Sequence, residues 1–139
     1  MNEQDNTAAV KALYAAFGRG DIQYILERLT SDIEWTLEGP AILPFAGTMQ
    51  GPDGVLTFFQ ALATTQDDRK LTIDTIVAQG DMVATMGRYA ATVKATGKRF
   101  DSAVAHFFTF RNGKVAKFND FVNTALMAEA YQQAAAASR

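Results

Sequence analysis

The chain has 139 residues, of which 48% are hydrophobic and 20% charged, with a net charge of −2, one histidine and no cysteine. This balance is typical of one soluble domain, here taken as residues 1–139. The absence of cysteine excludes disulfides, thiolate nucleophiles and thiolate metal sites, and a single imidazole disfavours a zinc or iron centre. There is no cluster of Lys and Arg for nucleic acid and no apolar run of membrane-spanning length, so we expect a cytoplasmic protein.

The first half of the chain is predicted to form three helices and one strand. Apolar spacing predicts a helix over residues 4–18, and Asp21 is typical of the N-cap of a second, shorter helix that extends to include Leu29. Residues 33–38 alternate as a strand with Trp35 facing inward.

An apolar loop follows over residues 39–51 and contains Leu43 and Phe45. Pro52 then suits the first position of a third helix that runs to about residue 64. The alanine-rich tail at 134–137 continues a helical pattern.

The second half is predicted to be a meander of four strands, at about 70–79, 82–95, 98–110 and 114–123. Helices followed by antiparallel strands indicate an α+β fold. We expect the three helices to cover one face of a strongly curved, mostly antiparallel sheet and to enclose a conical pocket. Gly87, inside the second of these strands, would ease a bend there.

The only histidine, His106, and Asp120 lie on the last two predicted strands among alternating apolar residues. Burying two titratable groups is costly, so both are candidates for chemistry, although a structural pair of buried, hydrogen-bonded side chains remains the alternative. The turn between the strands decides whether they share a face.

Two registers are open at this turn. A two-residue turn at Asn112-Gly113 sets His106 opposite Asn119 and turns Asp120 to the other face. A three-residue loop that includes Arg111 pairs Phe110 with Lys114, sets Val104 opposite Asp120, and makes His106 and Asp120 diagonal neighbours roughly 5–8 Å apart at the backbone. We favour the three-residue loop because it collects the apolar residues of both strands on one face.

Several segments together resemble the SnoaL-like members of the nuclear-transport-factor-2-like (NTF2-like) superfamily, which includes ketosteroid isomerases and polyketide cyclases. They are Leu-Tyr-Ala-Ala-Phe-Gly-Arg-Gly-Asp at 13–21, Ser-Asp-Ile-Glu-Trp at 31–35, Gly-Pro-Asp-Gly-Val-Leu-Thr-Phe-Phe at 51–59, Ala-Thr-Gly-Lys at 95–98 and His-Phe-Phe-Thr-Phe-Arg-Asn-Gly-Lys-Val at 106–115. The resemblance covers almost the whole chain and implies the same cone-shaped fold.

The resemblance implies more about the site than about the reaction. In SnoaL-like cyclases a histidine and an aspartate on the last two strands act on the substrate, a pattern similar to His106 and Asp120, although many members are acidic where this chain has Asn123. The ketosteroid isomerase pattern matches less well, because Tyr14 is about one residue out of place and only Glu38 could replace the general base. The Asp–Arg–Asp set of limonene-epoxide-hydrolase-like members is missing.

The resulting hypothesis is a small enzyme that needs neither cofactor nor metal and moves a proton next to the carbonyl of an apolar, cyclic or polyketide-like ligand. Asp120 would be the base, and His106, with Tyr14, would stabilise the enolate oxygen. The side chains expected to contact the ligand are apolar or aromatic: Trp35, Phe45, Val104, Phe108 and Phe118.

The alternative is a ligand-binding or dimerisation module without turnover. For either function we expect a homodimer through the outer face of the sheet, to which the predicted strands assign four large apolar side chains: Tyr89, Val93, Phe107 and Phe121.

Overall fold

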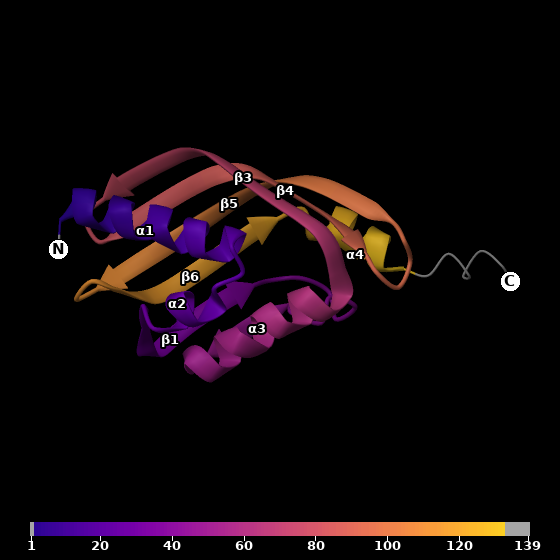
Figure 1. The fold of residues 1–139 in the computed structure, drawn as a ribbon, viewed down its shortest axis with the longest axis horizontal. Helices are drawn as coiled ribbons and strands as arrows, with labels where there is room; N and C mark the ends of the chain where they lie inside the picture. Colours follow the sequence, from indigo (N-terminus) through magenta and orange to yellow (C-terminus); the bar gives the residue numbers. More distant parts are fainter. Residues whose placement is uncertain (1, 133–139) are drawn as a thin grey trace, which may run out of the picture.

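A computed structural model describes residues 2–132 of the chain, so the predicted helical continuation at 134–137 lies outside the described residues. Figure 1 shows long, curved strands with the helix at residues 51–65 beneath them. In chain order the elements are α1 (Glu3–Gly18), α2 (Ile22–Leu26), β1 (Leu29–Leu37), β2 (Gly47–Gln50), α3 (Gly51–Thr65), β3 (Gln66–Gln79), β4 (Met82–Val93), β5 (Arg99–Arg111), β6 (Lys114–Val122) and α4 (Thr124–Tyr131).

Local signals account for where the first two helices begin. Asn2 and Asp5 form a capping box at the start of α1, each side chain bonding to the backbone N–H of the other residue. The Asp21 side chain accepts a hydrogen bond from the Tyr24 N–H at 3.1 Å, which confirms it as the N-cap of α2. That helix is shorter than predicted, because Leu29 pairs with Val115 at the start of β1 instead.

All six strands form one sheet in the order β2-β1-β6-β5-β4-β3. Neighbours are antiparallel except for β1 and β6, which are parallel, so the predicted mostly antiparallel sheet is confirmed. Part of the predicted loop at 39–51 is wrong, since residues 47–50 form the edge strand β2 against β1. A strand of four residues carries too short a pattern to be found from its sequence.

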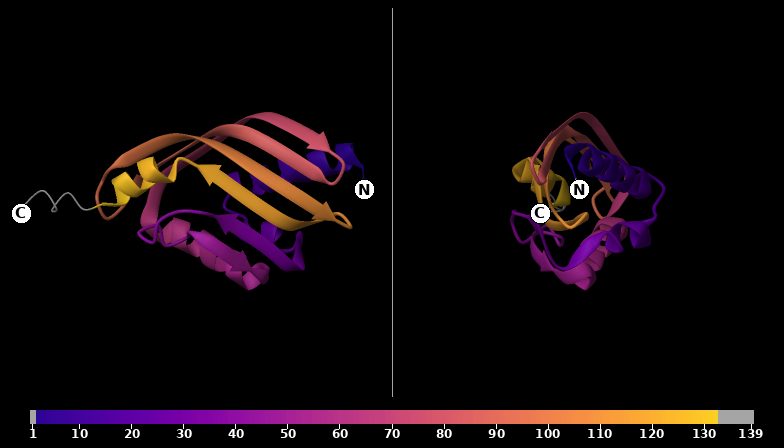
Figure 2. Two further views of the ribbon diagram at one scale, coloured as in Figure 1. Left: turned by 180° about the vertical axis from the view of Figure 1, so that it is seen from behind. Right: turned by 90° about the vertical axis from the view of Figure 1, so that its left-hand side faces the viewer.

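The sheet curves strongly, and the end-on view in Figure 2 shows it arching around the helices. Asp74 is an extra residue in β3, because Ile73 pairs with Gly87 while Thr75 pairs with Met86. A Cβ atom on Gly87 would lie 1.8 Å from the carbonyl oxygen of Thr72. The backbones of β3 and β4 therefore approach so closely at this bulge that only glycine fits.

The turn between β5 and β6 differs from both predicted registers. Asn112 and Gly113 form a two-residue turn with φ of 53° and 81°, the positive values of a type I′ hairpin, and Arg111 pairs with Lys114. The predicted pairing of Phe110 with Lys114 is wrong.

A bulge in β6 then shifts the pairing by one residue, so that the apolar side chains of both strands point to the same face of the sheet. Phe110 pairs with Val115 but Thr109 pairs with Lys117, which leaves Ala116 as an extra residue in β6. The expected common apolar face is therefore confirmed, although Val104 lies opposite Val122 rather than Asp120.

The outer face of the sheet, turned away from α1 and α3, is rich in apolar side chains. Val77, Met86 and Phe121 are 58%, 55% and 53% exposed, and Phe107 packs edge-on against Phe121. Tyr89 and Val93 do not belong to this face as predicted. They alternate with the outer residues of β4 and are buried in the core.

Candidate functional site

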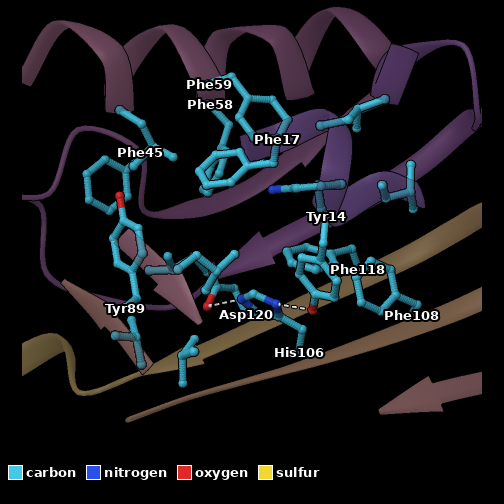
Figure 3. Close-up of a pocket in the computed structure, with 18 of the residues that line it drawn as sticks. Tyr14, Phe17, Phe45, Phe58, Phe59, Tyr89, His106, Phe108, Phe118 and Asp120 are labelled. Atoms are coloured by element: carbon cyan, nitrogen blue, oxygen red, sulfur yellow. Dashed lines mark hydrogen bonds and ion pairs between the residues drawn. The ribbon is translucent and has the colours of Figure 1, made fainter. Parts of the chain in front are cut away.

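A cavity lies between the concave face of the sheet and helices α1 and α3, where the close-up in Figure 3 shows aromatic side chains gathered around His106. Its open volume is about 80 Å³. That is room for a few water molecules, whereas sites for larger ligands measure about 300–1,000 Å³. A ring-sized ligand therefore has to displace some of the aromatic side chains that now fill the space.

His106 and Asp120 lie directly opposite each other on β5 and β6 and both line the cavity. His106 Nε2 is 3.4 Å from Asp120 Oδ1, and the two side chains are only 8% and 14% exposed. This distance is too long for a strong hydrogen bond, and Oδ1 makes no hydrogen bond to another protein atom of the described residues. The carboxylate therefore keeps acceptor capacity for a ligand.

Tyr14 reaches the same pair from α1, and the dashed line in Figure 3 joins its hydroxyl to His106. The hydroxyl is 2.7 Å from His106 Nδ1 and 2.6 Å from Thr85 Oγ1. If Nε2 carries the imidazole proton toward Asp120, Tyr14 donates to Nδ1 and Thr85 donates to Tyr14. This assignment gives the Tyr14 and Thr85 hydroxyls and His106 Nδ1 a hydrogen bond each and turns the imidazole N–H toward the carboxylate.

Burial raises the pKa of the Tyr14 phenol well above its ordinary value of 10, and the nearby Asp120 carboxylate raises it further, while the Thr85 hydrogen bond opposes them. Tyr14 therefore stays a neutral donor at physiological pH. Thr85, buried on the inner face of β4, was not identified from the sequence. A threonine at an inward position of an otherwise apolar strand was the one available signal.

The five residues expected to contact a ligand all line the cavity. Trp35, on β1, stacks on Phe118 with 3.9 Å between ring centroids, while Phe108 packs beside Tyr14 and Phe118. Phe45, from the segment before β2, is fully buried against Phe58. Val104 lies two residues before His106 on the same face of β5.

Tyr89 also lines the cavity, whereas the sequence pattern predicts it on the outer face of the sheet. Its hydroxyl donates to Gln66 Oε1, and Gln66 Nε2 donates to the Tyr131 hydroxyl at 2.9 Å, so this network joins β4 and β3 to α4. Burial raises the pKa of Tyr89, as it does that of Tyr131.

Asn123 and Glu38, two other positions raised by the resemblance to related families, lie outside the site. Asn123 is the N-cap of α4 and accepts from the Leu126 N–H at 3.1 Å, which gives it a structural role. Glu38 is exposed beyond the end of β1.

Within residues 2–132, no group of three or more His, Asp or Glu side chains is placed to hold a metal ion. None of the helices in that range is long and apolar enough to cross a membrane.

The buried tyrosines predict how stability depends on alkaline pH. The folded protein keeps Tyr14 and Tyr89 protonated above pH 10, whereas the unfolded chain releases both protons. Unfolding then releases protons, so the free energy of unfolding should fall above about pH 10 by about 1.4 kcal/mol per pH unit for each tyrosine.

Urea unfolding at several alkaline pH values measures this slope, and Tyr14→Phe and Tyr89→Phe should each reduce it. Tyrosinate absorbance gives an independent reading on the folded protein. Ionisation of all four tyrosines together near pH 10 would contradict the expectation.

Comparisons with known proteins agree with this architecture. Residues 10–118 match the family model of the SnoaL-like domain. The structure of an NTF2-like protein from Burkholderia thailandensis is 33% identical, with a TM-score of 0.84 over 95% of this chain and 99% of that chain. TerC, co-crystallised with polyporic acid, is 29% identical, with a TM-score of 0.83 over 91% of this chain and 98% of its own.

A candidate polyketide cyclase from Xanthomonas campestris pv. campestris has the same fold at 22% identity, with a TM-score of 0.79 over 95% of this chain and 100% of that chain. A comparison with curated proteins finds no match.

Proposed function

This chain belongs to the SnoaL-like domain family of the NTF2-like fold, and on that premise we propose that it is an enzyme that moves a proton next to the carbonyl of an apolar cyclic ligand. One observation carries the proposal. The Asp120 carboxylate lies directly opposite His106 at an apolar cavity and has an oxygen without a hydrogen bond.

Asp120 acts as the base in this proposal, and its surroundings suit that role. Aromatic rings exclude water from the carboxylate, while the imidazole 3.4 Å away orients it and can stabilise its charge. Tyr14 and Thr85 hold the imidazole in turn, so Tyr14 acts through His106. Isomerisation, aldol cyclisation and dehydration all begin with this proton transfer.

The ligand we propose is flat and largely apolar, since aromatic side chains line the cavity from two sides: Trp35, Phe108 and Phe118 from the sheet and Phe58 from α3. The crystallisation of the related TerC with polyporic acid supports a cyclic ligand with ring carbonyls.

Deuterium exchange tests the proposal with β-tetralone, a bicyclic ketone that has acidic C–H bonds beside its carbonyl. In heavy water the protein should accelerate exchange at these bonds, followed by NMR of the ketone. Trp35 is the only tryptophan, so its fluorescence should report binding in the same sample.

A second function is favoured by one specific observation, the small open volume of about 80 Å³. A cavity filled by its own aromatic rings suits a module that binds a ligand without turnover. Quenching of Trp35 fluorescence without accelerated exchange of any acidic ketone would favour that module over the enzyme.

We also propose that two copies of the chain associate through the outer face of the sheet, where Val77, Met86 and Phe121 are exposed. Phe121→Lys should convert the dimer to a monomer, because two lysines would be buried at a symmetric contact. Ile42→Lys, at an apolar residue of the segment before β2 that is 43% exposed, is the control and should remain dimeric. Sedimentation velocity measures both, and a monomeric wild type would contradict the proposal.

A further inference from the structure

The indole nitrogen of Trp35 is buried without a hydrogen-bond partner. Trp35 is only 5% exposed, and its Nε1–H donates to no described group of the protein. Buried N–H groups in folded proteins nearly always have partners, because leaving one unpaired costs free energy. Trp35 lines the cavity, so a ligand that displaces neighbouring side chains there would supply the missing acceptor.

The other polar atoms of the cavity lining are mostly engaged. The Tyr14 hydroxyl contacts both Thr85 and His106, and the Tyr89 hydroxyl donates to Gln66. Among the fully buried side-chain atoms of the cavity lining, two have no hydrogen-bond partner in the described residues, the Trp35 Nε1–H and Asp120 Oδ1. One is a donor and the other an acceptor, so they complement a ligand that offers an oxygen to the first and a proton to the second.

The fold places these two groups near each other on one face of the sheet. Leu37 pairs with Asp120 across the parallel strands β1 and β6, and Trp35 lies two residues before Leu37 on the same face. Strand spacing then puts the Trp35 and Asp120 backbones roughly 8 Å apart. That separation would span the reacting part of a small ring once the ligand has displaced the side chains that now fill the space.

Packing holds the Trp35 ring rigidly. It stacks on Phe118 at 3.9 Å between centroids and meets the edges of Phe58 and Phe59 at 5.7 Å and 5.5 Å. A donor fixed in a water-poor site before the ligand arrives stabilises developing charge without rearrangement.

We propose that the Trp35 Nε1–H binds the carbonyl oxygen of the ligand and stabilises the enolate, an inference that rests on the proposed function. Asp120 takes the proton from the carbon beside the carbonyl. The electrons of that C–H bond form the C=C bond of the enolate, and the carbonyl π electrons move to the oxygen that Trp35 holds. The substrate class is therefore a flat cyclic ketone with an acidic C–H bond next to its carbonyl.

NMR of the wild-type protein tests the contact without relying on catalysis. With ¹⁵N labelling, the only tryptophan gives one indole N–H resonance. Binding of β-tetralone should shift this resonance downfield and slow its exchange with water, while tetralin, which lacks the oxygen, should do neither. Equal responses to the two compounds would overturn the inference.

Trp35→Phe supplies the kinetic test, since it keeps an aromatic ring but removes the donor. We expect β-tetralone exchange to slow about a hundred-fold, the lower end for loss of one charge-stabilising donor. Phe59→Leu perturbs the same aromatic cluster but keeps the indole, and it should slow exchange much less.

The outcomes separate the two proposals. An unchanged rate in Trp35→Phe, with a wild type that catalyses exchange, would overturn the role of Trp35 and leave the proposed enzyme intact. An indole shift specific to the ketone without any exchange would support the contact and contradict the enzyme. If Trp35→Phe does not fold, the comparison of β-tetralone with tetralin by NMR of the wild type still tests whether the indole N–H contacts the ketone oxygen.

Discussion

Asp120→Asn should slow deuterium exchange of β-tetralone by about 10²–10⁴-fold, the usual contribution of a positioned general base. The amide has the shape of the carboxylate but cannot accept the proton. The neighbouring imidazole cannot replace it directly, because Tyr14 occupies His106 Nδ1 and the other ring nitrogen faces residue 120. Exchange kinetics in heavy water measure the rates of wild type and variant.

Asp101→Asn is the matched control, since it makes the same change of charge on the neighbouring strand β5. Asp101 pairs with Arg88 on the surface, with side chains that are 62% and 58% exposed, so its loss should leave both rate and stability nearly unchanged. Quenching of Trp35 fluorescence should show that Asp120→Asn still binds the ketone. Equal exchange rates in wild type and Asp120→Asn would refute the assignment of Asp120 as the base.

Gly87→Ala should lower the free energy of unfolding by about 3 kcal/mol or more, at the upper end for overpacking a buried site. The new methyl group would meet backbone atoms, with the Thr72 carbonyl oxygen at 1.8 Å and the Ile73 Cα at 2.9 Å, and backbone in a paired strand cannot move aside easily. Relief of this clash would require β3 and β4 to separate at the bulge. Urea denaturation measures the loss.

Gly18→Ala is the control for this substitution. Gly18 ends α1, and a Cβ atom there would meet nothing within 4 Å. Alanine in a helix is favoured over glycine, so stability should stay the same or rise by up to about 1 kcal/mol. Similar losses of unfolding free energy in the two variants would show that the close backbone approach at Gly87 is not the reason why alanine is unfavourable there.

The curvature that depends on Gly87 also shapes the site, because the arch of the sheet leaves space between β4–β6 and helices α1 and α3. A flatter sheet would pack its inner aromatic residues directly onto the helices. Loss of stability in Gly87→Ala should therefore be accompanied by loss of ketone binding, which Trp35 fluorescence can follow.

Much of the fold could be predicted from local patterns. Helix α3 was predicted from Pro52 onward, and it buries the apolar residues that recur at helical spacing in its sequence, Val55, Phe58, Phe59 and Leu62. The turn glycines separate the long strands close to where they were expected, because glycine relieves the strain of positive φ. The loop predicted at residues 47–50, where the structure has β2, and the outer-face positions of Tyr89 and Val93 were wrong. A short edge strand and the facing of a long strand depend on distant partners.

Local sequence patterns predict only part of the candidate site. Alternating apolar residues around His106 and Asp120 were enough to indicate that both face the interior, because the side chains of a strand alternate regardless of what the strand pairs with. Their direct opposition results from the bulge at Ala116, which no local pattern marked. Thr85 and the unpaired Trp35 nitrogen became visible only when α1, β1 and β4 were placed around the cavity.

The sequence by itself determined the longer helices and strands and most of the alternation of apolar residues along them, since these follow from periodicity and turn chemistry over a few residues. Only the tertiary structure decided which polar atoms meet and which are left without a partner. Those outcomes depend on register and curvature, and a shift of one residue in a strand changes every contact across it.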